Sequence, residues 1–171
     1  MVRHILITGA AGSGTSTLAA ALASELGAAH LEADDFLWLP SNPPYQHLAD
    51  KNQRGGRLLE AMQAAGRTVV AGSVMGWGQA LEDAFELVVF LYVPAQLRLQ
   101  RLQQREVERF GAAKPEFMAW AAGYDDGDGV GRSLRRHLQW LAGLGCVVVR
   151  LEGDMGVEER ARRVLGVVRG D

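Results

Sequence analysis

The sequence predicts an α/β protein, a three-layer α/β/α sandwich built around a five-stranded parallel sheet. The first observation is that five short apolar runs alternate with segments of helical pattern. The second is that these runs are continuously apolar, which is typical of parallel strands covered on both faces. Such alternation requires right-handed crossovers and places ligands outside the carboxyl ends of the strands.

The five strands are predicted from the apolar runs in chain order. The runs read RHILIT, AAHLEA, RTVVAG, ELVVFLYV and CVVVRL, at residues 3–8, 28–33, 67–72, 86–93 and 146–151. Each is short enough for a strand, and a segment of helical pattern separates successive runs except the third and fourth.

The helices are predicted from the segments that follow the strands. Leu18, Leu22 and Leu26 recur at helical spacing and predict the first helix, at residues 15–26. The other helices are predicted at residues 52–65, 95–110, 115–122, 131–143 and 156–168. Residues 38–47 and 123–131 are predicted as mobile loops. With no repeat and no long linker, residues 1–171 are predicted to form one domain.

Composition narrows the function classes. The 171 residues are 48% hydrophobic and 22% charged with a net charge of −2, which is ordinary for a globular domain and argues against a nucleic-acid binder. No apolar stretch approaches 18 residues, so we expect no membrane partner. The single cysteine, Cys146, excludes a disulfide framework within the chain, and no signal-peptide pattern opens it; we therefore expect a cytoplasmic protein.

A glycine-rich loop connects the first strand to the first helix. Its sequence, GAAGSGTS, matches the P-loop pattern G-x-x-x-x-G-K-[ST] except at the lysine position, which is Thr15. Backbone N–H groups of such a loop and the following helix N-terminus form an anion site. Ser16 is the expected Mg²⁺ ligand, with Thr17 as the fallback. The predicted phosphate-binding residues are Gly9, Ala10, Ala11, Gly12, Ser13, Gly14, Thr15, Ser16 and Thr17.

The missing lysine bears on activity more than on binding. A hydrogen bond to a charged group is worth about 1.5–3 kcal/mol, so its loss costs roughly 10- to 150-fold at the step that uses it. The backbone cradle and the metal ligand remain. Only Lys51 and Lys114 are present elsewhere, and both are distant in the sequence.

Two aspartates follow the second predicted strand. Asp34 and Asp35 should lie at the same sheet edge as the P-loop, where one can hold Mg²⁺ and the other can orient or deprotonate an acceptor hydroxyl. The alternative is that one of them caps a turn or helix.

An arginine stripe lies along the predicted helix 95–110. Arg98, Arg101, Arg105 and Arg109 share one face, and we expect them to form a lid that clamps phosphates, joined by Arg132 from another element. The alternative is a solvated face in which Glu106 and Glu108 offset the positive charge.

Glycines and aromatic residues also gather at the predicted ligand edge. Gly72 and Ser73 end the third strand, where a ligand can approach the backbone or the chain can simply turn. Trp38, Tyr45 and Trp77 either wall an acceptor pocket or are scattered surface aromatics, whereas Trp120 and Trp140 are expected in the core. The acidic loop 124–129 lacks the downstream glutamate of a calcium loop and is interpreted as a turn.

Together these segments resemble the P-loop kinases of the adenylate kinase, shikimate kinase and gluconate kinase group. They are similar above all to uncharacterised bacterial adenylate kinase-like proteins, which share the GSGT, DDFLW, PP and GSVMGW segments. The resemblance implies a P-loop NTPase fold with sheet order 2-3-1-4-5, ATP and Mg²⁺ as cofactors, an acceptor-binding segment near 34–65 and a small lid near 98–130. It implies that Ser16 and Asp34 hold the metal, and that Asp34, Asp35, Arg101 and Arg105 are catalytic.

Two departures from that group bear on the reaction. Thr15 replaces the lysine, and Ala71 stands where many of these kinases carry an aspartate. We predict an ATP-dependent kinase acting on a small-molecule or nucleotide acceptor. A nucleotide-binding module without transfer activity and a slow NTP hydrolase remain the alternatives. The donor base, the acceptor and the oligomeric state stay open, because no pattern in the sequence specifies them.

Overall fold

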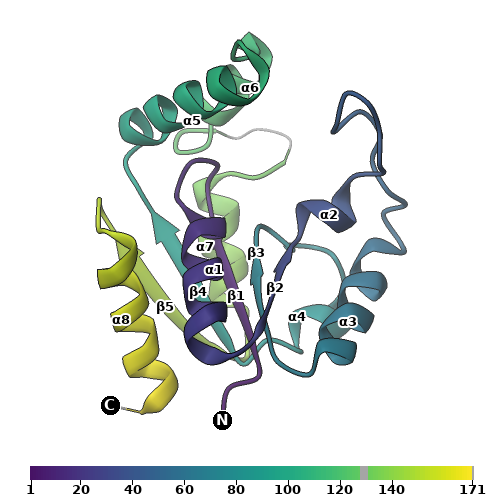
Figure 1. Cartoon of the computed structure of the whole chain (residues 1–171), viewed down its shortest axis with the longest axis vertical. Coiled ribbons are helices and arrows are strands. Elements are labelled where there is room, and N and C mark those ends of the chain that lie inside the picture. Colours follow the sequence, from purple (N-terminus) through teal and green to yellow (C-terminus); the bar gives the residue numbers. More distant parts are fainter. Residues whose placement is uncertain (128–130, 171) are drawn as a thin grey trace.

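The computed structural model describes residues 1–127 and 131–170, and it confirms the predicted fold class (Figure 1). All strand pairs of the five-stranded sheet are parallel, in the order β2-β3-β1-β4-β5 that the resemblance implied. The strands are β1 (His4–Gly9), β2 (Ala29–Glu32), β3 (Thr68–Ala71), β4 (Leu87–Tyr92) and β5 (Val147–Glu152).

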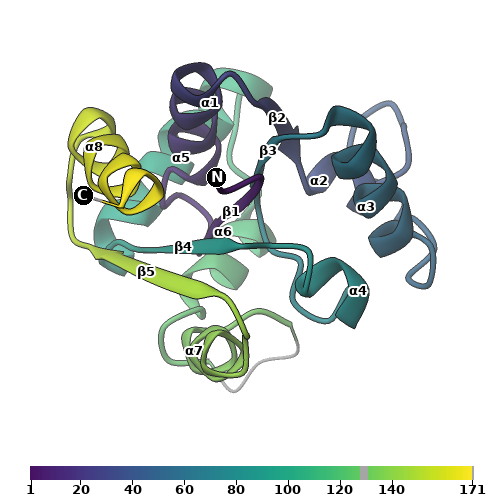
Figure 2. The same cartoon turned by 90° about the horizontal axis from the view of Figure 1, so that it is seen from below.

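Helices cover both faces of the sheet (Figure 2). α1 (Thr15–Leu26) and α8 (Val157–Arg169) pack on one face, and α3 (Arg54–Ala65), α4 (Gln79–Glu82) and α7 (Leu134–Ala142) pack on the other. Neighbouring residues of β1 show this division, because Ile5 and Ile7 join the first core cluster and Leu6 joins the second. All three side chains are at most 1% exposed, as expected for the central strand of a covered sheet.

The expectation that every strand is buried on both faces is wrong for the two edges. The residues of β2 are all half-buried, and β5 exposes Val147 to 56%. An edge strand has one neighbour rather than two, and α8 covers only part of β5.

Two helices stand beyond the carboxyl edge of the sheet. α5 (Ala95–Phe110) and α6 (Pro115–Ala122) lie above the P-loop in Figure 1. They have the bounds that the sequence predicts and occupy most of the predicted lid. Residues 128–130, at the end of that lid and within the predicted loop 123–131, lie outside the described residues.

The remaining differences from prediction are local. α7 begins at Leu134 rather than at 131, because the Ser133 hydroxyl caps it by accepting a bond from the Arg136 backbone N–H at 3.3 Å. The one-turn helices α2 (Asp34–Leu37) and α4 were not predicted, since four residues are too few to show a helical period. Among the described residues, no helix is both long and apolar enough for a transmembrane span.

Candidate active site

The P-loop runs from the end of β1 to the start of α1. Gly12 and Gly14 adopt φ of 83° and 88°, a left-handed region that favours glycine. Gly9 is required for another reason, because a Cβ there would lie 2.5 Å from the Leu91 carbonyl oxygen of β4. The loop therefore curls tightly against the sheet, with Ser13 N–H donating to the Ala10 carbonyl at 3.1 Å.

Two buried arginines hold the backbone carbonyls of this loop. Arg98 Nη1 donates to the Ala11 carbonyl at 3.3 Å, and Arg160 Nη1 donates to the Ser13 carbonyl at 2.8 Å. Their side chains are 0% and 4% exposed. The expectation that Arg98 clamps phosphates is wrong in this structure: it sits in the first turn of α5, against Gly12, and also pairs with Asp125 at 3.2 Å.

The expected metal ligand, Ser16, meets a carboxylate that sequence reasoning missed. Its hydroxyl donates to Glu32 Oε2 at 3.0 Å, and His30 Nε2 lies 2.8 Å from Glu32 Oε1. Burial raises the pKa of Glu32, and the nearby negative charge of Asp34 also raises it, while Ser16 and His30 lower it. The available signal was an acidic residue at the carboxyl end of the second strand.

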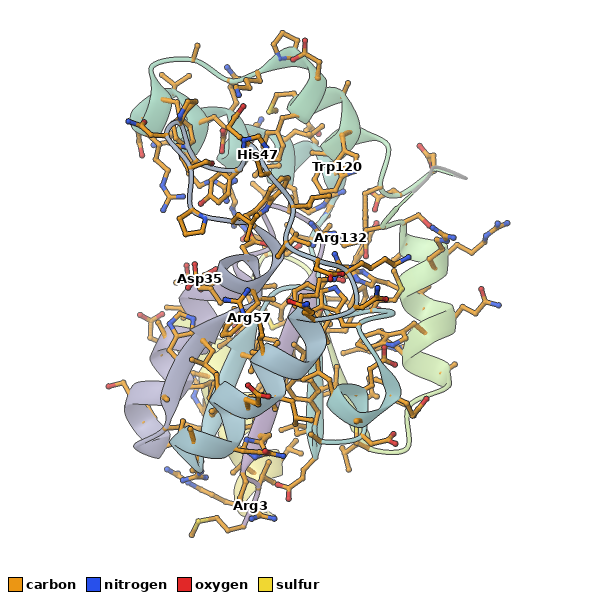
Figure 3. The ribbon with its side chains drawn as sticks, turned by 90° about the vertical axis from the view of Figure 1, so that its right-hand side faces the viewer. Arg3, Asp35, His47, Arg57, Trp120 and Arg132 are labelled. Atoms are coloured by element: carbon orange, nitrogen blue, oxygen red, sulfur yellow. The ribbon has the colours of Figure 1, made fainter. Side chains whose placement is uncertain are left out.

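Asp34 and Asp35 form the first turn of α2 and are exposed, and Figure 3 labels Asp35. The N-cap residue is Ala33, and the cap has no side-chain hydrogen bond. Neither aspartate therefore serves as the cap, although carboxylates in a first turn are favourable for a helix. Asp34 lies within electrostatic reach of Arg132: burial lowers the pKa of the Arg132 guanidinium, and the Asp34 charge counteracts that effect.

Arg132 joins this edge from the segment before α7. Its guanidinium lies 5.2 Å from the centroid of the Trp120 ring, and Figure 3 shows the two side by side. The prediction that Trp120 belongs to the core is wrong, since it is 43% exposed. α6 stands away from the sheet, and Trp120 packs instead against Phe117, with ring centroids 5.9 Å apart.

Two of the other three lid arginines, Arg101 and Arg105, have partners outside this group. Arg101 forms an ion pair with Asp154, which follows β5, and Arg105 pairs with Glu106 at 3.1 Å. The Arg105 pair is the arrangement expected of a solvated helix face. The predicted clamping role therefore requires a movement of α5 that separates Arg101 from Asp154. It also requires a side-chain rearrangement that separates Arg105 from Glu106, which lies on the same helix.

A buried hydrogen-bonded chain ends at Ser73, after β3. The hydroxyl of Tyr124 lies 2.6 Å from His137 Nδ1, and His137 Nε2 lies 3.2 Å from Ser73 Oγ. Burial, followed by the positive charge of Arg132, lowers the pKa of His137 to about 4. Burial raises the pKa of Tyr124, so both groups are neutral near pH 7. Neither Tyr124 nor His137 was predicted as a site residue.

The three aromatic residues that were candidates for the wall of an acceptor pocket take part in two separate contacts. Trp38 and Tyr45 meet edge to face at 5.9 Å, whereas Trp77 packs under the Arg54 guanidinium at 4.7 Å. Gly72 has φ of 120° and approaches Ala33, where a Cβ would come within 2.8 Å of the Ala33 Cβ. The glycine at this strand end therefore permits close packing of the chain on itself.

The donor set fits a magnesium nucleotide. The Ser16 hydroxyl, the Glu32 carboxylate and the Asp34 carboxylate lie beside the phosphate cradle, and Mg²⁺ is usually held by one or two carboxylates together with substrate phosphates. Within residues 1–127 and 131–170, no group of three or more His, Cys, Asp or Glu side chains is placed to hold a metal alone.

The sheet order, with a P-loop after its central strand and helices above its carboxyl edge, defines the class: the fold is that of the P-loop kinases. The family model described as an AAA domain matches residues 5–118, and the chain belongs to that family. It is 38% identical over 176 residues to the uncharacterized protein YqaC of Bacillus subtilis (strain 168), covering 96% of this chain and 97% of that protein.

Solved structures share the fold at low sequence identity. Shikimate kinase from Acinetobacter baumannii, in complex with shikimate, matches with a TM-score of 0.66 and 18% identity over 99% of this chain and 94% of that one. A gluconokinase from Sinorhizobium meliloti 1021 matches with a TM-score of 0.59 and 20% identity over 98% and 92% of the two chains.

Proposed function

We propose that this protein is an ATP-dependent phosphotransferase that acts on a small-molecule or nucleotide acceptor. The observation that carries the proposal is the presence of three features at one sheet edge: the P-loop, the Ser16–Glu32 hydrogen bond, and Asp34 within electrostatic reach of Arg132. Phosphoryl transfer depends mainly on positioning and on charge stabilisation, and these features supply both.

Each residue at the proposed site has a role that follows from its chemistry. N–H groups of residues 9–17 cradle the phosphates, and Ser16 with Asp34 holds Mg²⁺, with Glu32 as an added carboxylate. When bound, Mg²⁺ screens the negative charge of the phosphates. Asp35 or Asp34 accepts the proton of the acceptor hydroxyl, and Arg132 stabilises charge on the transferred group.

The lid and the acceptor segment complete the proposal. Residues 34–65, which include α2 and α3, form the acceptor side, and residues 98–130 form the lid. On closure, Arg101 and Arg105 exchange Asp154 and Glu106 for phosphate oxygens. The two structural relatives whose names specify an acceptor suggest the first ones to try, shikimate and gluconate.

The experiment is ADP release from Mg²⁺–ATP with a panel of acceptors and a blank without acceptor. The panel holds shikimate, gluconate and other sugar acids, and nucleoside monophosphates, and Ser16→Ala is the control variant. We expect release that depends on one acceptor class and falls at least tenfold in the control. Binding of ATP without any release across the panel would contradict the proposal.

Thr15 and Ala71 favour a second candidate, a nucleotide-binding module without transfer activity. Both residues remove polar groups that the resembling kinases carry at the triphosphate. Tight Mg²⁺–ATP binding without turnover would support this module. Release of ADP at the same rate with and without acceptors would identify a slow hydrolase instead.

A further inference from the structure

The residue after Gly14 is the uncharged Thr15. A positively charged side chain from another helix nevertheless lies beside the P-loop. Thr15 occupies the lysine position of the P-loop, at the first residue of α1. Arg160 of α8 approaches the same turn, and its Nη1 lies 3.3 Å from the position that a Cβ on Gly14 would occupy. Ser13 and Arg160 are 147 positions apart in the sequence, so no local sequence motif could predict that they are close.

The hydrogen bonds of the Arg160 guanidinium to the described residues both go to backbone carbonyl oxygens. Nη1 donates to the Ser13 carbonyl at 2.8 Å and Nη2 donates to the Gly153 carbonyl at 3.0 Å. The side chain is 4% exposed, so little water screens its charge. Nε is buried without a hydrogen-bond partner, which leaves one donor of this group unused among the described residues.

Around the P-loop, the positive charge of Arg160 is not fully balanced by a carboxylate. Arg98 is paired with Asp125, and Arg101 is paired with Asp154. Burial and the charge of Arg101 lower the pKa of Arg160, while Asp154 raises it, so Asp154 serves two arginines. Within the described part of the chain, the cluster of Arg101, Arg160 and Asp154 thus carries one net positive charge.

We propose that Arg160 is a positioning residue for the nucleotide and supplies, from the carbonyl side of the loop, the positive charge that the P-loop lysine provides elsewhere. Its bond to the Ser13 carbonyl polarises the Ser13–Gly14 peptide, and the N–H of Gly14 at the other end of that peptide belongs to the phosphate cradle. The inference rests on the proposed function only in requiring that the protein binds a nucleotide phosphate.

The test is a double-mutant cycle of Arg160→Met and Thr15→Lys, read out as the dissociation constant of Mg²⁺–ATP by calorimetry. We expect Arg160→Met to weaken binding about tenfold, the low end for one lost interaction with a charged group. Thr15→Lys should restore most of that loss in the Arg160→Met background and change wild-type affinity less than threefold. Arg160→Lys, which keeps the charge, should bind within about threefold of wild type.

The matched control is Arg67→Met. Arg67 is also held by two backbone carbonyls, those of Val2 and Leu26, but at the opposite end of the sheet. We expect it to lower the unfolding temperature without changing nucleotide affinity. If Arg160→Met yields too little folded protein, Arg160→Gln takes its place in the same cycle.

The outcomes separate the inference from the function. If Thr15→Lys improves affinity by the same factor with and without Arg160, or if Arg160→Met leaves affinity unchanged, the inference is overturned while nucleotide binding stands. If wild type does not bind Mg²⁺–ATP, both the inference and the proposed function fail. Strong non-additivity supports the inference whether or not any acceptor is phosphorylated.

Discussion

The His137 imidazole is buried and neutral, and its protonation state links stability to pH. Because its pKa is lowered to about 4, the unfolded chain binds a proton here at pH values where the folded protein does not. The resulting stability is complete above the ordinary histidine pKa of about 6.5 and is lost as the pH falls toward 4. Ser73, Tyr124 and Arg132 are the groups that face it.

We therefore expect the unfolding free energy of wild type to fall by about 2 kcal/mol more than that of His137→Gln between pH 7 and pH 5. Urea unfolding at both pH values measures the difference. The variant loses hydrogen bonds at either pH, so only the change between the two pH values reports the titration. Equal losses in the two proteins would assign the pH dependence to other groups.

Ser16 is expected to act through the metal rather than through the phosphates directly. In Ser16→Ala, the gain in ADP affinity that Mg²⁺ brings should shrink about tenfold, while binding in EDTA should stay unchanged. Titrations of a fluorescent ADP with and without Mg²⁺ measure both quantities. Thr17→Ala is the comparison, and loss of the Mg²⁺ effect in that variant alone would transfer the ligand role to Thr17.

At the scale of elements, α5 is joined to the P-loop by one buried side chain. Arg98 donates to the Val93 carbonyl at 3.0 Å, to Ala11 of the P-loop and to Asp125 beyond α6. A guanidinium suits this position because its fixed fork reaches three acceptors at once. The end of β4, the P-loop and the base of the lid are thereby tied together.

Arg98→Met should destabilise the fold by about 3 kcal/mol, because it leaves a half-buried aspartate and two carbonyls without their donor. Chemical denaturation measures this change. Arg163→Met is the control, since Arg163 pairs with Glu159 on the exposed face of α8 and should contribute less than about 1 kcal/mol. A loss below 1 kcal/mol for Arg98→Met would contradict the structural role of the side chain.

At the scale of the whole molecule, the proposed lid is the part that we expect to move in the proposed phosphoryl transfer. α5 and α6 expose Val107, Phe110 and Trp120 to 45%, 50% and 43%. We expect Mg²⁺–ATP to slow amide hydrogen exchange in α6 as the lid closes over the nucleotide. β4, already buried, is the internal reference, and slowing confined to residues 9–17 would contradict closure.

Much of this architecture could be predicted, because its signals are local. Apolar runs and helical spacing act within a few residues, and they located all five strands and the bounds of α1, α5 and α6. The P-loop was visible for the same reason. The exposure of β5 and of Trp120 was not, because burial depends on which elements lie across from a residue.

The sequence by itself determined the α/β class, the strand–loop–helix that forms the P-loop, and the placement of Asp34 and Asp35 at its edge. Only the tertiary structure decided which charges meet there. It paired Ser16 with Glu32, brought Arg132 within electrostatic reach of Asp34, and brought Arg160 to the carbonyl side of the loop. The physical reason is the distance along the chain over which each feature is determined. Backbone conformation and periodicity are set by near neighbours in the sequence, whereas contacts between distant segments depend on how the helices pack on the sheet.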